Sequence, residues 1–578
     1  MKQIYIIASF LMSIPVFSQL HIKPYGSQDS FVYVESSFLF GEKQIDLSIN
    51  PSEVKKASLY LRDEAQLLQG ISSSSNTGNG MLSVFQEGNA SAYTYNYWSS
   101  PVQDVLGSSA FGSILYDPLD ELNSKKALIT SDLNGTSNPL KISDRWIYKF
   151  TGGTYSDWIY VGKNFDLLPG EGFTMKGVDG TNTGVNIYSI PNNPGNKQRY
   201  DFRGKPHNGT IRLAVEKDKN RLVGNPYPSA LDLKNFLEEN LSITGVAYFW
   251  DSSPVASHYL SDYEGGYGVY SPAGGNNGYV PPVFSKFDDT GNQLHTTGEN
   301  GKHIARRFAP IGQGFLVEGK QQGTLIFENE YRVFEKENSV TSEFKLNGSN
   351  SSETSMIRFN VEFKEKYVRQ LLLIHHPDAT SEIDHAMDAK NISVLESDAG
   401  FLMDEMSYLI NVRPFEKMEE IPLFLKVAIP SEVIFHKTTV VFPNRIYLLD
   451  RDTKSYYDLS ENKLSIWLDS GEYHQRFMIT FNNGIDENAP EIKPYFLSES
   501  RIFQNNLLNR LEILFPEERS INTIFLFDSL GKKVVEAKTF GETNSYQFST
   551  QNLSNGIYLV KIIALDGRVI SKKVIISN

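Results

Sequence analysis

The chain contains no cysteine among its 578 residues. This absence excludes disulfides, thiolate-bound zinc, iron–sulfur clusters and cysteine nucleophiles, and it excludes a lipoprotein acylated on cysteine. A chain of this length without disulfides must be stabilised by large apolar cores, by bound ions, or by both. At ~100–200 residues per domain, we expect roughly three to five domains.

Basic residues are in the minority. The 55 Lys and Arg are outnumbered by 68 Asp and Glu, which gives a formal net charge of -13. The charges are spread along the chain rather than collected in blocks. Nucleic acids and anionic membranes are bound by basic surfaces that displace counterions, so we expect no nucleic-acid partner.

Long apolar runs are also missing. The longest candidate, residues 4–17, is interrupted by Pro15 and is shorter than the ~20 residues that span a bilayer, which argues against a transmembrane anchor. It follows the positive Lys2 and ends near small residues, as a secretory signal peptide does. We therefore predict cleavage between Ser18 and Gln19 and an exported mature protein.

Helix-forming runs are scarce, whereas 30 Tyr and 36 Phe accompany many Gly, Asn and Ser residues. Short β-branched and aromatic stretches recur between Gly, Asn, Asp and Pro clusters, which is typical of antiparallel sandwiches. One helix is expected over residues 231–240, after the start signal Pro228-Ser229. We predict an all-β fold of several antiparallel β-sandwich or jelly-roll-like modules in tandem. The clearest strands are expected at residues 31–34, 57–61, 356–363, 370–374, 422–429 and 476–481.

An internal repeat joins residues 170–177 to residues 312–319, because both carry the pattern Gly-x-Gly-Phe shortly after a proline. A strand entered through Gly-x-Gly can approach a neighbouring backbone closely and then bury its Phe. The alternative is a phosphate-binding loop, but no Lys-Ser/Thr follows either copy and no helix is expected there. We favour the structural interpretation.

Two Pro- and aromatic-rich clusters accompany the repeat, at residues 96–101 (Asn-Tyr-Trp-Ser-Ser-Pro) and 222–229 (Leu-Val-Gly-Asn-Pro-Tyr-Pro-Ser). Together with the Gly-x-Gly-Phe strands, they resemble a recurrent ectodomain of large secreted and surface proteins. Those proteins belong to gliding and environmental Gram-negative bacteria that use type IX secretion. The resemblance covers residues 41–319 and implies a location rather than a chemistry.

Residues 341–484 read as a further sandwich with one loop that invites a metal interpretation. His375 and Asp378 precede Asp384 and Asp388, and such oxygen and imidazole ligands can hold calcium or zinc. The cluster fits neither EF-hand nor zincin spacing, and a solvated polar loop is the favoured alternative. We therefore expect no cofactor, with calcium as the candidate to test.

A second loop in this region places Asp450 next to Arg451 and within reach of Arg476. Either arginine would form an ion pair with Asp450 at a strand end. If this pair is exposed to solvent, it contributes only modestly to stability. The pattern resembles the sandwich that often precedes type IX sorting domains, which implies a spacer or presentation module.

The C-terminal residues 497–578 follow a Pro-containing linker and read as a small all-β domain. Short strands are expected at residues 511–515, 523–527, 532–535 and 546–548, and Asp566-Gly567 is a favoured two-residue turn. The strings at 527–534, 553–560 and 571–574 resemble a type A C-terminal sorting domain of type IX secretion. The residues that match its motif are Gly531, Lys532, Asn555, Gly556, Tyr558, Lys561, Gly567, Lys572 and Lys573.

This resemblance implies a fold, a partner and a destination. Such domains are Ig-like sandwiches that carry cargo across the outer membrane through the type IX secretion machinery. They are then usually removed, and the cargo is attached to surface lipopolysaccharide or released. We expect the mature chain to be secreted or held on the outer-membrane surface.

Beside this predicted sorting domain, the sequence contains none of the common catalytic motifs. The sequence lacks the Gly-x-Ser-x-Gly elbow, His-Glu-x-x-His, the P-loop and the dinucleotide fingerprint, so we assign no catalytic residue. We expect a non-catalytic adhesive or glycan-binding protein with extracellular glycans or cells as partners. The alternative is a secreted polysaccharide- or protein-degrading hydrolase, for which Asp117, Asp120 and Glu121, or Asp262 and Glu264, would be the candidate carboxylates. We favour the interpretation of these residues as loop acids or calcium ligands.

Four tyrosines in a Gly-rich stretch are the candidate ligand-binding aromatics, because Tyr supplies rigid amphipathic contact area. The competing interpretation places the same side chains in the core of a sandwich. These tyrosines are Tyr259, Tyr263, Tyr267 and Tyr270.

The predicted organisation has seven segments. They are a signal peptide (1–18), an N-terminal β region (19–90), β modules with the first and second repeat units (91–220 and 221–340), a β-sandwich spacer (341–484), a linker (485–496) and the sorting domain (497–578).

Overall fold

A computed structural model describes most of the chain between residues 20 and 577. The gaps are residues 53–55, 72–74, 90, 105–110, 338–354, 364–366, 442–443, 461–462, 483–499, 520, 530, 539–542 and 565–568. The predicted signal peptide, its cleavage site at Ser18 and Gln19, and the turn at Gly567 lie outside the described residues.

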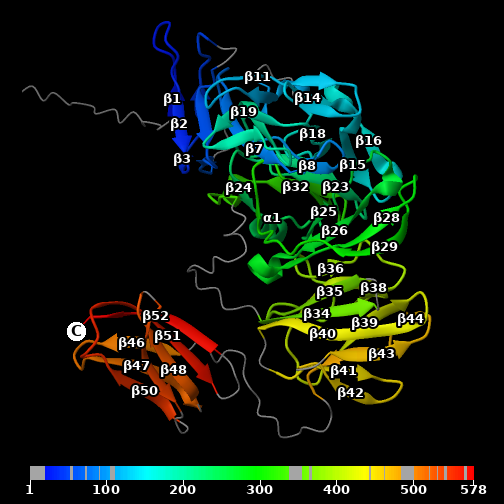
Figure 1. Cartoon of the computed structure of the whole chain (residues 1–578), viewed down its shortest axis with the longest axis vertical. Helices are drawn as coiled ribbons and strands as arrows, with labels where there is room; N and C mark the ends of the chain where they lie inside the picture. Colours follow the sequence, from blue (N-terminus) through cyan, green and yellow to red (C-terminus); the bar gives the residue numbers. More distant parts are fainter. Residues whose placement is uncertain are drawn as a thin grey trace, which may run out of the picture.

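The prediction of an all-β fold is confirmed, since strands dominate every part of the described chain (Figure 1). In the N-terminal part, one sheet forms around the long, fully paired strand β21. Its order is β11 (Ser124–Lys126), β10 (Leu115–Pro118), β21 (Gln198–Pro206), β7 (Leu82–Gly88), β5 (Leu59–Arg62) and β2 (Val32–Glu35).

A second large sheet occupies the middle of the body and mixes strands from both repeat units. Its order is β16 (Trp158–Tyr160), β15 (Tyr148–Gly152), β23 (Asn220–Gly224), β31 (Gly314–Glu318), β25 (Ala247–Ser252), β26 (Glu264–Tyr270), β28 (Val283–Phe287) and β29 (Gln293–Asn300). Strands β8 (Tyr95–Trp98) and β17 (Phe173–Lys176) form a separate pair. Isolated β-bridges beside this pair, Trp98 with Gln313 and Glu171 with Val223, connect it to the second sheet.

The two repeat copies have matching surroundings. Each Gly-Phe strand pairs with the aromatic cluster of its own copy, with Phe173 opposite Trp98 and Phe315 opposite Val223. A Cβ added to Gly172 would lie 2.9 Å from the Val223 nitrogen, and one added to Gly314 would lie 2.9 Å from the Trp98 nitrogen. Both phenylalanines are buried, so the predicted close approach and buried Phe are confirmed.

The predicted helix exists but begins two residues later than expected, as α1 (Leu233–Glu239). Residues Ala230–Asp232 form strand β24 instead, because Leu231 pairs with Ala309 on one side and Arg332 on the other. The Asp232 side chain caps the helix by accepting a hydrogen bond from the Lys234 nitrogen at 3.0 Å. None of the described helices is long and apolar enough to cross a membrane.

The predicted spacer region forms a twelve-stranded sheet system. Its central strands are β37 (Asp398–Met403), β38 (Met406–Arg413), β35 (Tyr367–His375), β34 (Ser355–Phe363) and β40 (Ser431–Val441). Four further strands of the same system are β39 (Glu420–Val427), β41 (Tyr447–Asp450), β43 (Leu464–Leu468) and β45 (Phe477–Thr480).

One apolar core runs through both this region and the second repeat module. It contains Tyr248, Val269 and Leu316 from the module together with Ile357, Leu372 and Ile410 from the spacer. Apolar contacts therefore cross the predicted boundary at residue 340, and the domain limits stay a prediction.

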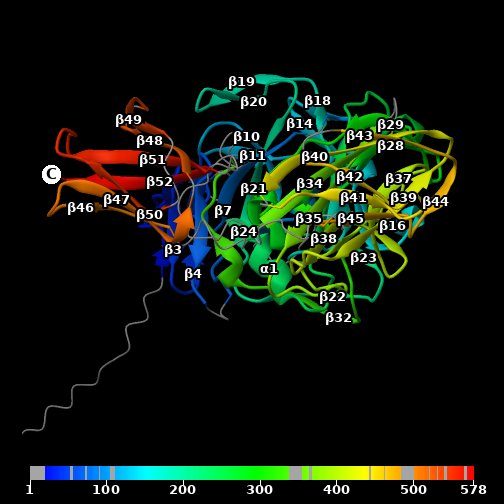
Figure 2. The ribbon, with the colours of Figure 1, turned by 90° about the horizontal axis from the view of Figure 1, so that it is seen from below.

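The C-terminal residues form a unit with its own core, in two layers (Figure 2). One layer contains β46 (Arg501–Asn505), β47 (Arg510–Arg519) and β50 (Thr543–Ser549). The other contains β49 (Lys533–Lys538), β48 (Ile521–Phe527), β51 (Gly556–Ala564) and β52 (Val569–Ile576). The Ig-like assignment of this unit remains a prediction.

Candidate functional site

A buried lysine lies inside a cluster of aromatic rings. Lys176 ends strand β17 and is only 3% exposed. Its Nζ lies 3.7 Å from the ring centroid of Trp146, 4.8 Å from that of Tyr95 and 5.2 Å from that of Tyr263. No ion pair joins it to a carboxylate within the described part of the chain. We call Lys176, Tyr95, Trp146, His258 and Tyr263 the lysine cluster.

The loop between β25 and β26 closes this cluster. His258 stacks on Trp146 at 4.8 Å with an interplanar angle of 8°, and its Nδ1 lies 3.0 Å from Lys176 Nζ. The Tyr263 hydroxyl lies 2.6 Å from the same Nζ. The ammonium therefore donates to an imidazole nitrogen and a phenol, and a cation–π contact with Trp146 adds to these bonds.

Burial sets the acid–base behaviour of the cluster. Loss of hydration lowers the pKa of Lys176 to about 7. Burial, followed by the neighbouring Lys176 charge, also lowers the pKa of His258. Burial likewise raises the pKa of Tyr263 and of Tyr95. A buried amine that titrates near neutrality is characteristic of functional sites, so the lysine cluster is our candidate site.

Lys176 lies within the first Gly-x-Gly-Phe repeat copy, but no motif in the sequence marked it as a site residue. The second repeat copy has Glu318 at the position equivalent to Lys176. This change of charge between the copies indicated that Lys176 is not one of the residues that both copies need for their common strand. Trp146 and His258 lie far from Lys176 along the chain, so no local pattern marked the cluster.

The four tyrosines predicted to bind ligand take different places. Tyr259 is 75% exposed, whereas Tyr263 is buried in the lysine cluster and Tyr270 is 0% exposed in the apolar core. Tyr267 is half-buried, with its hydroxyl 2.7 Å from that of Tyr97. The core interpretation is therefore the right one for Tyr270, and Tyr259 is the member that solvent reaches freely.

Further tyrosines, exposed or half-buried, lie beside members of the lysine cluster in space or in sequence. Tyr155, Tyr160 and Tyr259 are exposed, and Tyr93 and Tyr148 are half-buried. The Tyr148 and Tyr160 rings are 5.5 Å apart, and the Tyr93 ring is 4.9 Å from His258. We call these five residues the aromatic patch, which the sequence analysis identified only through Tyr259.

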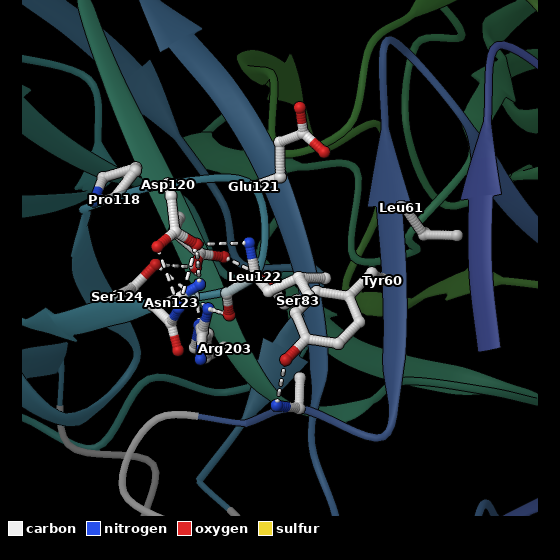
Figure 3. A network of polar contacts seen from close by, with 12 residues as sticks. Tyr60, Leu61, Ser83, Pro118, Asp120, Glu121, Leu122, Asn123, Ser124 and Arg203 are labelled. Carbon is white, nitrogen blue, oxygen red and sulfur yellow. Dashed lines mark hydrogen bonds and ion pairs between the residues drawn. The ribbon is translucent and has the colours of Figure 1, made fainter. Parts of the chain in front are cut away.

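A second polar network is formed by side chains from the strands of the N-terminal sheet and the turn beside it (Figure 3). Asp201 and Arg203 are fully buried and form an ion pair of 2.5 Å, and Asp201 also accepts bonds from Ser83 and Ser124. Arg62 donates to the Glu121 carbonyl at 2.7 Å. Arg62 also donates to the carbonyl and the hydroxyl of Ser83, so the network links strands β5, β7, β11 and β21 to one another.

The acids weighed for a hydrolase lie around this network. Asp120 accepts bonds from the backbone nitrogens of Leu122 and Asn123 at 2.9 and 2.7 Å, which orders the turn drawn in Figure 3. Asp117 is buried, accepts a bond from the Leu140 nitrogen and lies 3.3 Å from Lys125. Both carboxylates are thus engaged in structural contacts.

The structure does not gather the four residues of the suggested metal site. The His375 ring is buried against Phe415 and Phe481, and burial lowers its pKa to about 4, whereas Asp378 points into solvent. Asp384 and Asp388 lie together, with the Asp384 nitrogen donating to Asp388 at 2.8 Å. Among the described residues, no group of three or more His, Asp or Glu side chains is placed to hold a metal ion.

The same loop instead joins the spacer to the second repeat module. The Ala386 nitrogen donates to the Thr244 carbonyl at 3.0 Å, and His385 Nε2 lies 3.1 Å from the Glu238 carbonyl oxygen. Gly245 has φ +85°, and a Cβ there would lie 2.5 Å from Ala386, so a side chain at this position would be excluded. We call residues 384–388 the contact loop.

The predicted ion pair of Asp450 forms with Arg476 and not with Arg451. Arg476 donates to both carboxylate oxygens, at 2.9 and 2.8 Å, whereas Arg451 pairs with Glu420 at 2.6 Å. The arginine hydrogen bonds lower the pKa of Asp450 despite the opposing effect of burial.

The predicted sorting-motif residues are distributed over the C-terminal unit. Gly531 has φ +78° in the turn before β49, where an L-residue would be strained. Gly556 begins β51, and the buried Tyr558 donates its hydroxyl to the Ser554 carbonyl at 2.9 Å. Asn555 precedes β51, and Lys532, Lys561, Lys572 and Lys573 lie on or beside the strands of the same layer, with Lys561 half-buried and the other lysines exposed.

Two family models match the chain. Residues 39–481 match a family described as a domain of unknown function, DUF8693, and residues 502–577 match the secretion system C-terminal sorting domain. The second match confirms the resemblance to type IX secretion cargo, and it indicates export to the cell surface or the medium and interaction with the type IX secretion machinery. No curated protein matches the chain.

Solved structures give only weak likenesses. The CupB2 chaperone of Pseudomonas aeruginosa is 8% identical with a TM-score of 0.11, over 40% of this chain and 90% of that one. Latent PorU of Porphyromonas gingivalis is 8% identical with a TM-score of 0.13, over 65% and 35%. A tandem repeat of a large adhesion protein is 11% identical with a TM-score of 0.10, over 75% and 93%. Scores this low carry no argument.

Proposed function

The chain belongs to the DUF8693 family through residues 39–481, and we propose that this body is a non-catalytic, carbohydrate-binding part of an exported adhesive protein. The observation that carries the proposal is the aromatic patch. In it, the exposed Tyr155 interacts electrostatically with Tyr95 and Tyr263 of the lysine cluster, the exposed Tyr160 packs against Tyr148, and the exposed Tyr259 follows His258 in the chain. Tyrosine rings offer an apolar face to sugar C–H groups and a hydroxyl to sugar oxygens.

The surrounding structure favours recognition over turnover. One ring of the patch, Tyr93, lies 4.9 Å from His258, which itself stacks on Trp146, and Tyr148 and Tyr160 pack edge to face, so these rings are held before a ligand arrives. Rigid aromatic anchors lose little entropy on binding and dominate interface energies. Surface lipopolysaccharide, extracellular polysaccharides and cell-surface glycans are the partners that such a patch would meet after export.

Replacing Tyr155 and Tyr259 together by alanine is expected to weaken binding to a polysaccharide ligand by at least about tenfold, which corresponds to ~1.4 kcal/mol. The mature full-length chain is titrated against neutral and acidic polysaccharides by calorimetry. Trp467→Ala is the matched control, because Trp467 is an exposed aromatic on β43, outside the patch.

Three outcomes would contradict the proposal. They are unchanged binding in the double variant, equal loss in the Trp467 control, and absence of saturable binding by the parent chain. Turnover of a polysaccharide or protein substrate by the parent chain would favour the hydrolase alternative instead.

A further inference from the structure

The C-terminal unit exposes an apolar surface on one of its two sheets. Ile557, Leu559 and Ile575 are 56%, 37% and 70% exposed. Cross-strand partners share a face, and Ile557 pairs with Ile575 while Leu559 pairs with Phe527. The Phe527 ring lies 5.9 Å from that of Phe525, so one continuous apolar surface covers β48, β51 and β52.

Lysines surround this apolar surface. Lys573 lies directly opposite Leu559, and Lys561 lies opposite Phe525. Lys533 places its Nζ 5.5 Å from the centroid of the Phe525 ring. The acidic residue on this side, Glu536, is already paired with Lys533 and with Lys538, the latter at 3.0 Å. We call the apolar residues with Lys533, Lys561 and Lys573 the outer face.

The opposite sheet of the same unit has a different exterior. Its outward side chains include Arg501, Glu512 and Gln547 together with Phe503 opposite Glu512, and Glu512 is paired with Arg510 at 2.9 Å. Its exposed leucines, Leu507 and Leu508, lie in the turn between β46 and β47 and not on the sheet surface. The apolar side chains needed for folding are already buried between the sheets in the unit's own core. The isoleucines of the outer face therefore contribute nothing to that core, and exposed apolar clusters of this kind mark interaction sites.

We propose that the outer face is the docking surface by which a protein of the type IX secretion machinery recognises this cargo. The proposal deepens the match of residues 502–577 to a sorting domain, on which it rests. The partner surface would be apolar at its centre and rimmed by carboxylates, which complement Lys561 and Lys573. A second copy of this chain is a poor occupant, because packing two outer faces together would oppose lysine to lysine.

The test compares two pairs of substitutions in the full chain, expressed in a bacterium that has this secretion system. Ile557→Ser with Ile575→Ser removes the apolar centre, and Lys561→Glu with Lys573→Glu reverses the rim. Each pair is expected to lower the protease-accessible surface fraction by about tenfold, as loss of a contact worth ~1.4 kcal/mol would, and to leave intact chain in the periplasm. Arg501→Glu with Phe503→Ser on the other sheet is the matched control and should leave export unchanged.

Folding and partner identity are checked separately. Thermal melting of each purified variant must match the parent, and the charge-reversal pair keeps the test valid if the serine pair unfolds. A photo-crosslinker at position 575 is expected to trap a protein of the secretion machinery.

Three results would overturn the proposal. They are normal export of both folded variant pairs, an equal loss of export in the control, and cross-links only to lipopolysaccharide or to a second copy of the chain. Glycan binding is measured on purified protein, so its failure would be distinct from failure here.

Discussion

Deletion of residues 495–578 is expected to abolish surface display and to leave the remaining chain folded in the periplasm. The apolar core of the C-terminal unit, from Ile502 to Ile576, shares no residue with the three cores of the body. Removing the unit therefore exposes no body core to water, whereas it removes the whole sorting domain.

The measurement is fractionation with protease accessibility in intact cells, combined with melting of the truncated chain. The full-length Arg501→Glu, Phe503→Ser variant is the control for changes within the tail. Surface display of the truncated chain at the parent level would show that the sorting domain is dispensable. A large drop in the melting temperature of the body would show that the two parts depend on each other.

Lys176→Met is expected to stabilise the body by about 1–3 kcal/mol at pH 7. Burial lowers the pKa of Lys176 from 10.5 to about 7, so a fully protonated Lys176 costs roughly 5 kcal/mol in this site at ~1.4 kcal/mol per pKa unit. At pH 7 the folded chain is half deprotonated at this residue, and the cost is about 4 kcal/mol. Methionine fills a similar volume and has no charge to desolvate. Part of the gain is offset because His258 Nδ1 and the Tyr263 hydroxyl lose a donor, at about 1–3 kcal/mol.

The pH dependence gives this prediction a second signature. Between pH 10.5 and about 7 the unfolded chain binds a proton at Lys176 that the folded chain does not, so the stability of the parent rises with pH through this window. The advantage of Lys176→Met should therefore be largest below pH 7 and shrink towards pH 10.

Urea unfolding at several pH values measures the effect. Lys320→Met, at an exposed lysine, is the control and should change the free energy of unfolding by less than about 0.5 kcal/mol. If Lys176→Met lowers the free energy of unfolding at every pH, then Lys176 stabilises the fold through its contacts. In that case the proposal that Lys176 is kept for function although it destabilises the fold would be wrong.

Local patterns in the sequence predicted much of the fold. Alternation and turn residues indicated strands that the structure contains, such as residues 370–374 within β35, and the glycines of the repeat predicted the close approach at Gly172 and Gly314. Helix α1 begins late because Leu231 pairs with Ala309 and Arg332, which are distant in sequence, and this tertiary pairing overrides the local start signal.

The candidate site was less predictable because its members come together only in the fold. Lys176 follows Phe173 and Met175 in a wholly buried strand, yet its partners Trp146 and His258 come from two other segments. The suggested metal residues failed to converge for a related reason. His375 ends a buried strand, whereas Asp384 and Asp388 shape a loop that contacts another module.

The contact loop has a mechanical consequence. In a chain held at its C-terminal end and pulled through a ligand on the aromatic patch, tension must cross from the spacer to the second repeat module. Ala386 to Thr244, Ser271 to Met387 and Arg358 to Tyr279 bridge that junction alongside a shared apolar core. Separating the spacer from the second repeat module would therefore break these hydrogen bonds and expose the apolar residues that the two parts share.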